Sequence, residues 1–87
     1  MKRRLLLDSD VVEYLAHLPL NERKKVWNRL REIAQSPDRF MDYQDRDNRG
    51  RDLAVHIYQS HAIQFWDDIA DQHLKILAIS AADQFPN

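Results

Sequence analysis

The sequence predicts an α+β fold in which a short strand and two helices are followed by three more strands. Two observations support this class: apolar residues recur at helical spacing in the first half, and they alternate with polar residues in the second half. When helices and strands are segregated along a chain, the helices usually pack on one face of an antiparallel sheet. We therefore expect an antiparallel-dominated four-stranded sheet with a two-helix hairpin packed on one face.

Composition fits one globular domain spanning residues 1–87. Hydrophobic residues make up 44% of the chain and charged residues 31%, which is far from the signature of disorder. There is no cysteine, and no apolar run approaches the ~20 residues that a membrane span needs. We expect a cytoplasmic protein with no membrane contact and no cofactor.

The first half is expected to hold one strand and two helices. Residues 2–7 form a short run that is basic at its start and apolar at its end, which is typical of a strand. Residues 9–18 place apolar side chains on one face of a short helix that a proline ends, and residues 21–35 repeat that pattern. Residues 37–50 have no sustained period and end at the only glycine, so we expect a loop there.

The second half predicts three strands. Two short apolar runs, within 51–58 and 62–66, alternate with polar residues and are separated by Gln59-Ser60-His61, as in an antiparallel pair. Residues 74–80 are apolar on both parities, which predicts a central strand covered on both sides. The largest apolar residues of the first run are expected to face the core, namely Leu53, Val55 and Ile57.

Several hairpin residues could take part in acid–base chemistry at a phosphate, which needs an acid, a base and a cation. Arg51 could hold the phosphate, His56 or His61 could transfer protons, and Tyr58 could stack on or orient a base. Alternation places His56 and Tyr58 together on the open face of the sheet. The alternative is that these are ordinary polar residues of a half-exposed hairpin.

A metal site is a weaker interpretation of the same stretch. It would combine imidazole and carboxylate ligands from His56, His61 and His73 with Asp67, Asp68 or Asp71. No compact ligand spacing supports such a site, so we expect no metal.

Positive charge gathers in the first half, although the net charge is −1. Residues 1–51 carry a net +3 and residues 52–87 a net −4. Phosphate binding needs clustered cations, so we expect nucleic-acid contacts from the second helix, the loop after it and an exposed tryptophan: Lys24, Lys25, Arg31, Arg46, Arg49 and Trp66. The helix cations are also explained as solvated charges that acidic neighbours dilute. Trp27 falls on the apolar stripe and is expected in the core.

The order of elements and several local phrases resemble the RelE/ParE superfamily, the toxins of type II toxin–antitoxin modules. The matching phrases are RRLLLDSD, AHLPLNERKKVWNRLREIAQSP, DRDNRGRD and AVHIYQSHAIQFWDDIADQHLKILAIS, and they extend to about residue 83. The resemblance implies a RelE-like fold and a cytoplasmic toxin neutralised by a cognate antitoxin that wraps around it. It implies one of two targets: the ribosome and its mRNA, cleaved by an mRNA interferase that inhibits translation, or DNA gyrase, poisoned by ParE-like members.

The chain departs from the ribonuclease branch of that superfamily at two places. An arginine usually opens the strand that reads HAIQFW here, where Ala62 stands, and a basic residue usually follows the last strand, where Ala81-Ala82-Asp83 stand. These departures favour an alternative function, a ParE-like or degenerate toxin-fold protein that acts without catalysis by binding an antitoxin or another protein.

Overall fold

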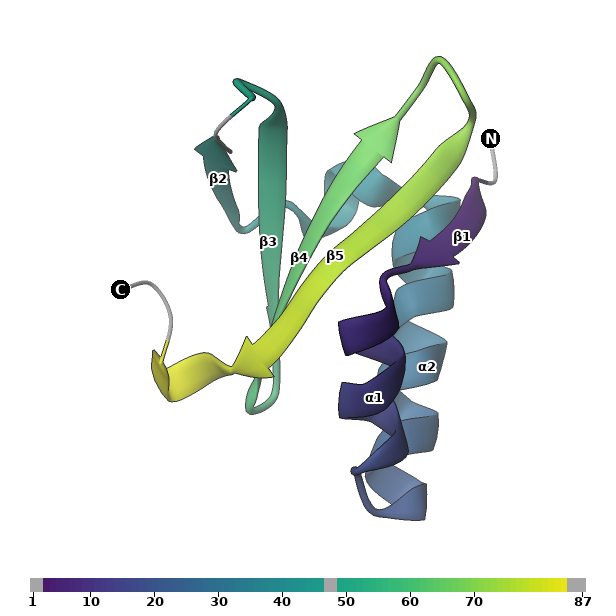
Figure 1. The fold of residues 1–87 in the computed structure, drawn as a ribbon, viewed down its shortest axis with the longest axis vertical. Helices are drawn as coiled ribbons and strands as arrows, with labels where there is room; N and C mark the ends of the chain where they lie inside the picture. Colours follow the sequence, from purple (N-terminus) through teal and green to yellow (C-terminus); the bar gives the residue numbers. More distant parts are fainter. Residues whose placement is uncertain (1–2, 47–48, 85–87) are drawn as a thin grey trace.

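The structure, a computed structural model, describes residues 3–46 and 49–84. Within them, five strands and two helices follow one another along the chain, with a short 3-10 turn after α2 and another after β5 (Figure 1). The elements are β1 (Arg4–Leu7), α1 (Ser9–Ala16), α2 (Leu20–Gln35), η1 (Pro37–Phe40), β2 (Tyr43–Arg46), β3 (Asp52–Tyr58), β4 (His61–Asp68), β5 (His73–Ala81) and η2 (Ala82–Gln84).

The strands form one mixed sheet in the order β1-β5-β4-β3-β2. Only β1 and β5 run parallel, while the other neighbours are antiparallel. The two helices connect β1 to the rest of the chain and lie together on one side of the sheet (Figure 1). The α+β class and the packing of the helical hairpin on one face are therefore confirmed.

The number of strands differs from the expected four, because β2 lies within the segment that was expected to be a loop. Residues 43–46 pair with residues 52–55 and form an outer strand. All four of its side chains are exposed, so no apolar period marks it in the sequence. Residues 47–48 of the expected loop, and residue 2 of the expected first strand, lie outside the described residues.

The core lies between the helices and one face of the sheet. Leu15, Leu30 and Ile33 from the helices and Ile63 and Phe65 from β4 are all at most 2% exposed. Burying an aliphatic or aromatic side chain of this size contributes about 1.5–3 kcal/mol. This apolar layer fixes the position of the helices on the sheet and thereby decides which polar side chains they cover.

A two-residue turn, Gln59-Ser60, joins β3 to β4 and sets the register of that hairpin. It pairs Tyr58 with His61 and His56 with Ile63. Directly opposed residues share one face of a sheet, and Ile63 belongs to the core beneath the helices. His56, Tyr58 and His61 therefore lie on the helix side of the sheet.

This register shows that the prediction of which side chains of β3 face the helices was wrong. A connection of three residues, Gln59-Ser60-His61, would place Leu53, Val55 and Ile57 in the core, and a shift of one residue moves every side chain to the opposite face. Leu53 and Val55 are nevertheless only 5% and 0% exposed, although they lie on the face away from the helices. Both parities of β3 are buried, so alternation alone could not identify the core side.

The position of β5 is confirmed, but the prediction that both of its faces are covered is wrong. It lies between β1 and β4. Leu74, Ile76 and Ile79 are buried, whereas Lys75 is half-buried and Ala78 is exposed. An irregularity in the β4–β5 register between Gln64 and Phe65 breaks the simple alternation, which explains why apolar residues occur on both parities.

Neither α1 nor α2 has the length and apolar character to cross a bilayer, and the rest of the described chain adds no such helix.

Candidate functional site

The four candidate catalytic residues are divided between the two faces of the sheet. His56, Tyr58 and His61 lie on the helix side, and the two histidines are 7% and 2% exposed. Arg51 follows the opposite parity and stacks on Trp66, on the face away from the helices. The structure therefore brings the acid–base candidates near the helices and places the cationic candidate elsewhere.

His56 connects α2 with the segment that leads into β2. Its Nδ1 lies 2.8 Å from Oδ2 of Asp42, and its Nε2 lies 2.9 Å from Nη1 of Arg29. The Arg29 guanidinium lies over the ring of Tyr58, 4.3 Å from its centre, and 5.1 Å from the centre of the Phe40 ring. This His56 cluster links three elements through one imidazole.

The neighbours of His56 determine its tautomer. A guanidinium only donates hydrogen bonds, so Nε2 must accept one from Arg29 and carries no proton. Nδ1 then carries the proton and donates it to the carboxylate of Asp42. Asp42 also accepts the backbone N–H of Ile57 at 2.8 Å. A neutral imidazole with both nitrogens occupied is well suited to hold structure together.

His61 forms a second network, with one residue from each helix. Its Nε2 lies 2.8 Å from Oε1 of Glu22, and its Nδ1 lies 2.8 Å from the hydroxyl of Tyr14. The carboxylate can only accept, so Nε2 donates to Glu22. Burial raises the pKa of the Tyr14 hydroxyl, and the charge of Glu22 raises this pKa further, so Tyr14 is a neutral phenol that can donate to Nδ1.

A third cluster lies on the face away from the helices, where two cations flank one indole. The guanidinium carbon of Arg51 lies 4.8 Å and Nζ of Lys75 4.9 Å from the centre of the Trp66 ring. Lys75 also bonds Oδ2 of Asp68 at 3.0 Å, and this hydrogen bond holds the pKa of the Asp68 carboxyl below its ordinary value. Cations over an indole are attracted by its electron-rich face. We call Arg51, Trp66 and Lys75 the Trp66 cluster.

His73 shares the face of the Trp66 cluster, and sequence reasoning considered it only as a metal ligand. It lies opposite Asp68 on β4 and beside Arg4 on β1. Alternation in the sequence could not predict this placement. The β4–β5 register shifts at one point, so the positions of β5 that face the helices are even-numbered before it and odd-numbered after it. His73 is the histidine that shares a face with Arg51 and Trp66.

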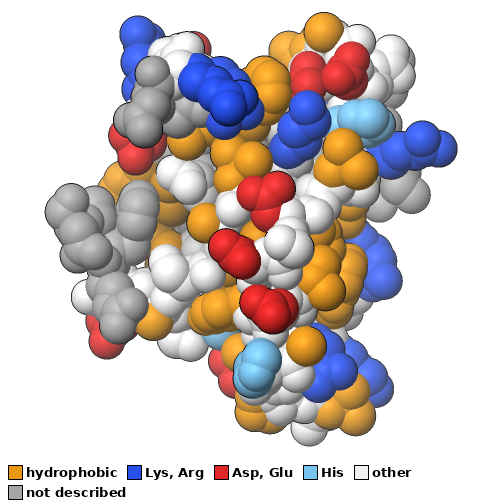
Figure 2. Space-filling model, viewed as in Figure 1, with side chains coloured by type: hydrophobic (Ala, Val, Ile, Leu, Met, Phe, Trp, Pro, Cys, Tyr) orange, Lys and Arg blue, Asp and Glu red, His pale blue; other side chains and the backbone are white. Residues whose placement is uncertain are grey.

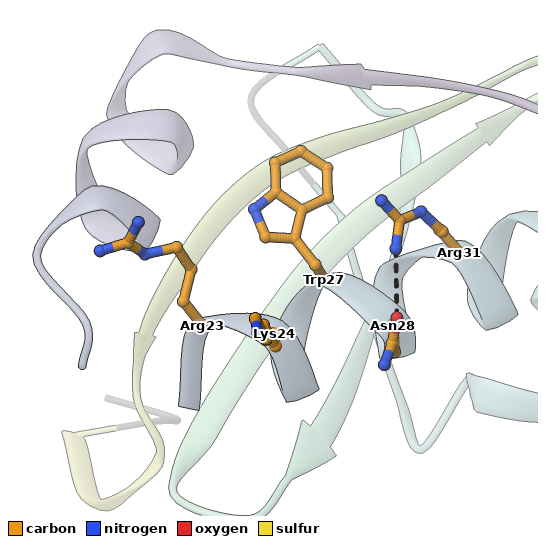
Figure 3. Close-up of a pocket in the computed structure, with 5 residues that line it drawn as sticks. All are labelled: Arg23, Lys24, Trp27, Asn28 and Arg31. Atoms are coloured by element: carbon orange, nitrogen blue, oxygen red, sulfur yellow. Dashed lines mark hydrogen bonds between the residues drawn. The ribbon is translucent and has the colours of Figure 1, made fainter. Parts of the chain in front are cut away.

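A hollow of about 300 Å³ lies on the outer surface of α2. Five residues of α2 line it (Figure 3): Arg23, Lys24, Trp27, Asn28 and Arg31. Of the three helix cations expected to bind nucleic acid, Lys24 and Arg31 line this groove and Lys25 does not. Trp27 is partly buried and packs against the core, so the prediction that it belongs to the core is confirmed in part. We call this surface the Trp27 groove.

The remaining two candidate cations lie near the outer strand β2. Arg46 forms an exposed ion pair with Asp52, with 3.2 Å between Nη2 and Oδ1, and Arg49 is exposed just before Gly50. Neither lines the Trp27 groove. The six predicted nucleic-acid contacts are thus distributed over three surfaces.

Charges on the two helices are segregated. Exposed acidic residues follow one another along α1 and its start, namely Asp8, Asp10 and Glu13. Figure 2 shows acidic side chains in a row over α1, with Lys and Arg side chains along the margin where Figure 1 places α2. The net charge of −1 therefore conceals a basic helix beside an acidic one.

Comparison with solved structures shows which known proteins share this architecture. No protein-family model matches the chain, and no curated protein matches it. A RelE–RelB complex from Pyrococcus horikoshii contains a chain that superposes with a TM-score of 0.78, at 18% identity, over 97% of this chain and 99% of that one.

The chain has the RelE fold.

A second RelE-fold structure, from the toxin–antitoxin complex RelBE2 of Mycobacterium tuberculosis, has a TM-score of 0.78 at 12% identity. It covers 93% of this chain and 92% of that one. The predicted RelE-like fold is therefore confirmed over nearly the whole chain. At these identities the likeness establishes the fold, and the roles predicted for individual residues stay predictions.

Proposed function

We propose that this chain is the toxin of a type II toxin–antitoxin pair, held inactive in the cytoplasm by a cognate antitoxin. The observation that carries the proposal is the RelE fold, matched over 97% and 93% of this chain. Both matching chains come from complexes of a RelE-type protein with its partner. Because fold alone does not determine function, the proposal needs a direct test.

The test is controlled expression in bacteria, alone and together with the short reading frame beside the gene. We expect growth arrest when the chain is expressed alone, relief when the neighbour is coexpressed, and co-purification of the two proteins. Normal growth together with recovery of the chain as an unaccompanied monomer would refute the proposal.

We further propose that the chain acts by binding its target rather than by RNA cleavage with His56 and His61. A general acid or base needs a ring nitrogen that can reach the substrate. Both ring nitrogens of each histidine lie within 2.9 Å of neighbouring side chains. Catalysis by the predicted set, including Arg51 and Tyr58, would require both networks to open and two faces of the sheet to act together.

The Trp66 cluster is our proposed contact with the target, because it combines an aromatic ring with cations on the face that the helices leave open. Ribosomal or messenger RNA and DNA gyrase remain the two targets to be distinguished. Arg51→Gln and Trp66→Leu should each weaken growth arrest. Each should raise the inducer concentration required for arrest at least tenfold. Arg46→Gln is the matched control, because its exposed ion pair with Asp52 contributes little to stability.

A second candidate function, ribosome-dependent mRNA cleavage, is supported by the position of His73. This histidine shares a face with Arg51, Trp66 and Lys75, which could hold a phosphate and a base. Primer extension on transcripts after induction tests it directly. Cleavage that disappears in His73→Asn and persists in His17→Asn would favour this function, whereas intact transcripts during clear growth arrest would exclude it and direct attention to gyrase.

A further inference from the structure

The Trp27 groove combines an aromatic floor with a cationic rim. The indole of Trp27 lies between Arg23 and Arg31 along α2 (Figure 3). Its lining contains three cations, one amide and no acidic residue. A volume of about 300 Å³ is at the lower end of the range for ligand sites.

Neighbouring groups hold the arginines of this rim in place. Nη2 of Arg23 donates to the backbone oxygens of Ala16 and Leu18, at 3.3 and 3.2 Å, where the carbonyls at the end of α1 attract a cation. Nη1 of Arg31 donates to Oδ1 of Asn28 at 3.1 Å. Its guanidinium carbon lies 5.7 Å from the centre of the Trp27 ring, so a ring that enters the groove meets a positioned charge.

We propose that the Trp27 groove binds single-stranded nucleic acid, with one base stacked on Trp27 and the adjoining phosphates held by Lys24 and Arg31. Aromatic platforms bordered by cations are the means by which proteins bind single strands without reading sequence. The carboxylate side chains of an acidic peptide would match the charge, but they offer no aromatic ring to stack on the indole. The combination of ring and cations therefore favours a nucleic acid over an acidic protein segment.

This site is separate from the Trp66 cluster. It is built by one helix, whereas the Trp66 cluster is built by the far face of the sheet. The inference does not depend on whether the chain is a toxin, since it concerns what the outer surface of α2 binds. A toxin with both surfaces could attach to RNA through the helix while its sheet contacts the target.

The test is a fluorescence anisotropy titration of the purified chain with a short fluorescein-labelled oligouridylate at several salt concentrations. Trp27→Leu should weaken binding roughly tenfold, since loss of one base–aromatic stack typically has an effect of that order. Trp27→Phe keeps an aromatic ring and should restore most of the affinity. Circular dichroism and a thermal midpoint for each variant separate loss of the site from loss of the fold.

Charge variants on the same helix provide a second, independent measurement. Each phosphate contact contributes about 0.7 to the slope of log affinity against log salt for a single strand, so Lys24→Gln combined with Arg31→Gln should reduce that slope by about 1.4. Lys25→Gln removes the same type of charge outside the groove and should leave the slope unchanged. A reduction of about 0.7 for Lys25→Gln, the same per removed charge as in the double variant, would overturn the proposal, because binding would then follow net charge alone.

A labelled oligoglutamate of the same charge distinguishes the other possible partner. We expect it to bind more weakly than the oligouridylate and to be insensitive to Trp27→Leu. Tighter binding of the peptide, with loss in that variant, would overturn the proposal in favour of an acidic protein segment. Growth arrest is measured separately, so a chain that binds RNA without toxicity refutes only the toxin proposal.

Discussion

His56 and His61 show how a histidine can look functional in a sequence and serve structure in the fold. Each uses both ring nitrogens to join side chains from two other parts of the chain. Buried polar groups are tolerated when every donor and acceptor is paired, and they specify one arrangement of the surrounding elements. The consequence is that the helix side of the hairpin is fixed by polar contacts as well as by the apolar core.

Replacing His56 by alanine should therefore destabilise the folded chain itself, in the absence of any partner or ligand. His56→Ala leaves Asp42 and Arg29 without their shared partner, and hydrogen bonds to charged groups contribute about 1.5–3 kcal/mol. We expect the free energy of unfolding in urea to fall by about 2–3 kcal/mol. His17→Ala, at an exposed position, should change it by no more than about 0.5 kcal/mol; equal effects would show that the bridging contacts contribute nothing.

The ion pair between Lys75 and Asp68 should make stability depend on pH. Because Lys75 lowers the pKa of the Asp68 carboxyl below its ordinary 3.8, its stabilising effect is present above that value and is lost as the pH falls through the pKa of the folded state. Lys75→Met should thus lower the free energy of unfolding at pH 7, and the difference from the natural chain should narrow as the pH falls below the ordinary pKa of an aspartate.

Urea titrations across this pH range measure the effect. Lys25→Met, at an exposed helix position, is the control and should show the same small difference at every pH. A difference for Lys75→Met that does not vary with pH would mean that its contact with Trp66, rather than with Asp68, accounts for the loss.

At the scale of elements, the Gln59-Ser60 turn decides on which face of the sheet His56 and Tyr58 lie. One residue more or fewer in this turn exchanges the two faces of β3. Gln59 has φ +54°, in the left-handed region that favours glycine over residues with a side chain. The hairpin therefore keeps its register although the turn holds a residue poorly suited to its conformation.

Gln59→Gly should stabilise the protein by about 0.5 kcal/mol, because relief of the left-handed conformation outweighs the added freedom of the unfolded chain. Ser60→Gly, at the neighbouring position without a positive φ, should instead lower stability by a similar amount. Thermal midpoints of the two variants measure the contrast. A loss of stability in both would show that the turn is not strained at Gln59.

At the scale of the whole molecule, the parallel pairing of β1 with β5 joins the first strand to the last and adds β1 as an edge strand of the sheet. Arg3 reinforces this pairing through Nε, 2.7 Å from Oδ1 of Asp67 on β4. A partner that binds only the folded chain stabilises the assembled sheet by mass action. Stability of the whole molecule can therefore report on the proposed antitoxin.

We expect the product of the neighbouring reading frame to raise the free energy of unfolding by about 2.7 kcal/mol when its free concentration is a hundred times its Kd. Calorimetry with increasing amounts of the purified partner measures this as a rising thermal midpoint. A midpoint that does not move at saturating concentration would contradict the proposed pairing, independently of any effect on growth.

The sequence by itself predicted the two helices and the last three strands, because helical and alternating periods depend on which residues face a core. The RelE-like class came from the resemblance of its local phrases to that superfamily. The sequence did not reveal β2, since a strand with four exposed side chains has no apolar period. Lys24 and Arg31, two of the helix cations expected to bind nucleic acid, line one groove, because residues seven positions apart lie on the same face of a helix.

Only the tertiary structure decided which face of the hairpin the histidines occupy and that Trp27 floors a groove. Both parities of β3 are buried, so the choice of face depended on the turn length and on Arg29 and Asp42, which reach His56 from elsewhere in the chain. Side-chain networks of this kind join residues 14 to 47 positions apart. Local periodicity carries no information about such distant partners, because it records burial and not the identity of the group that provides it.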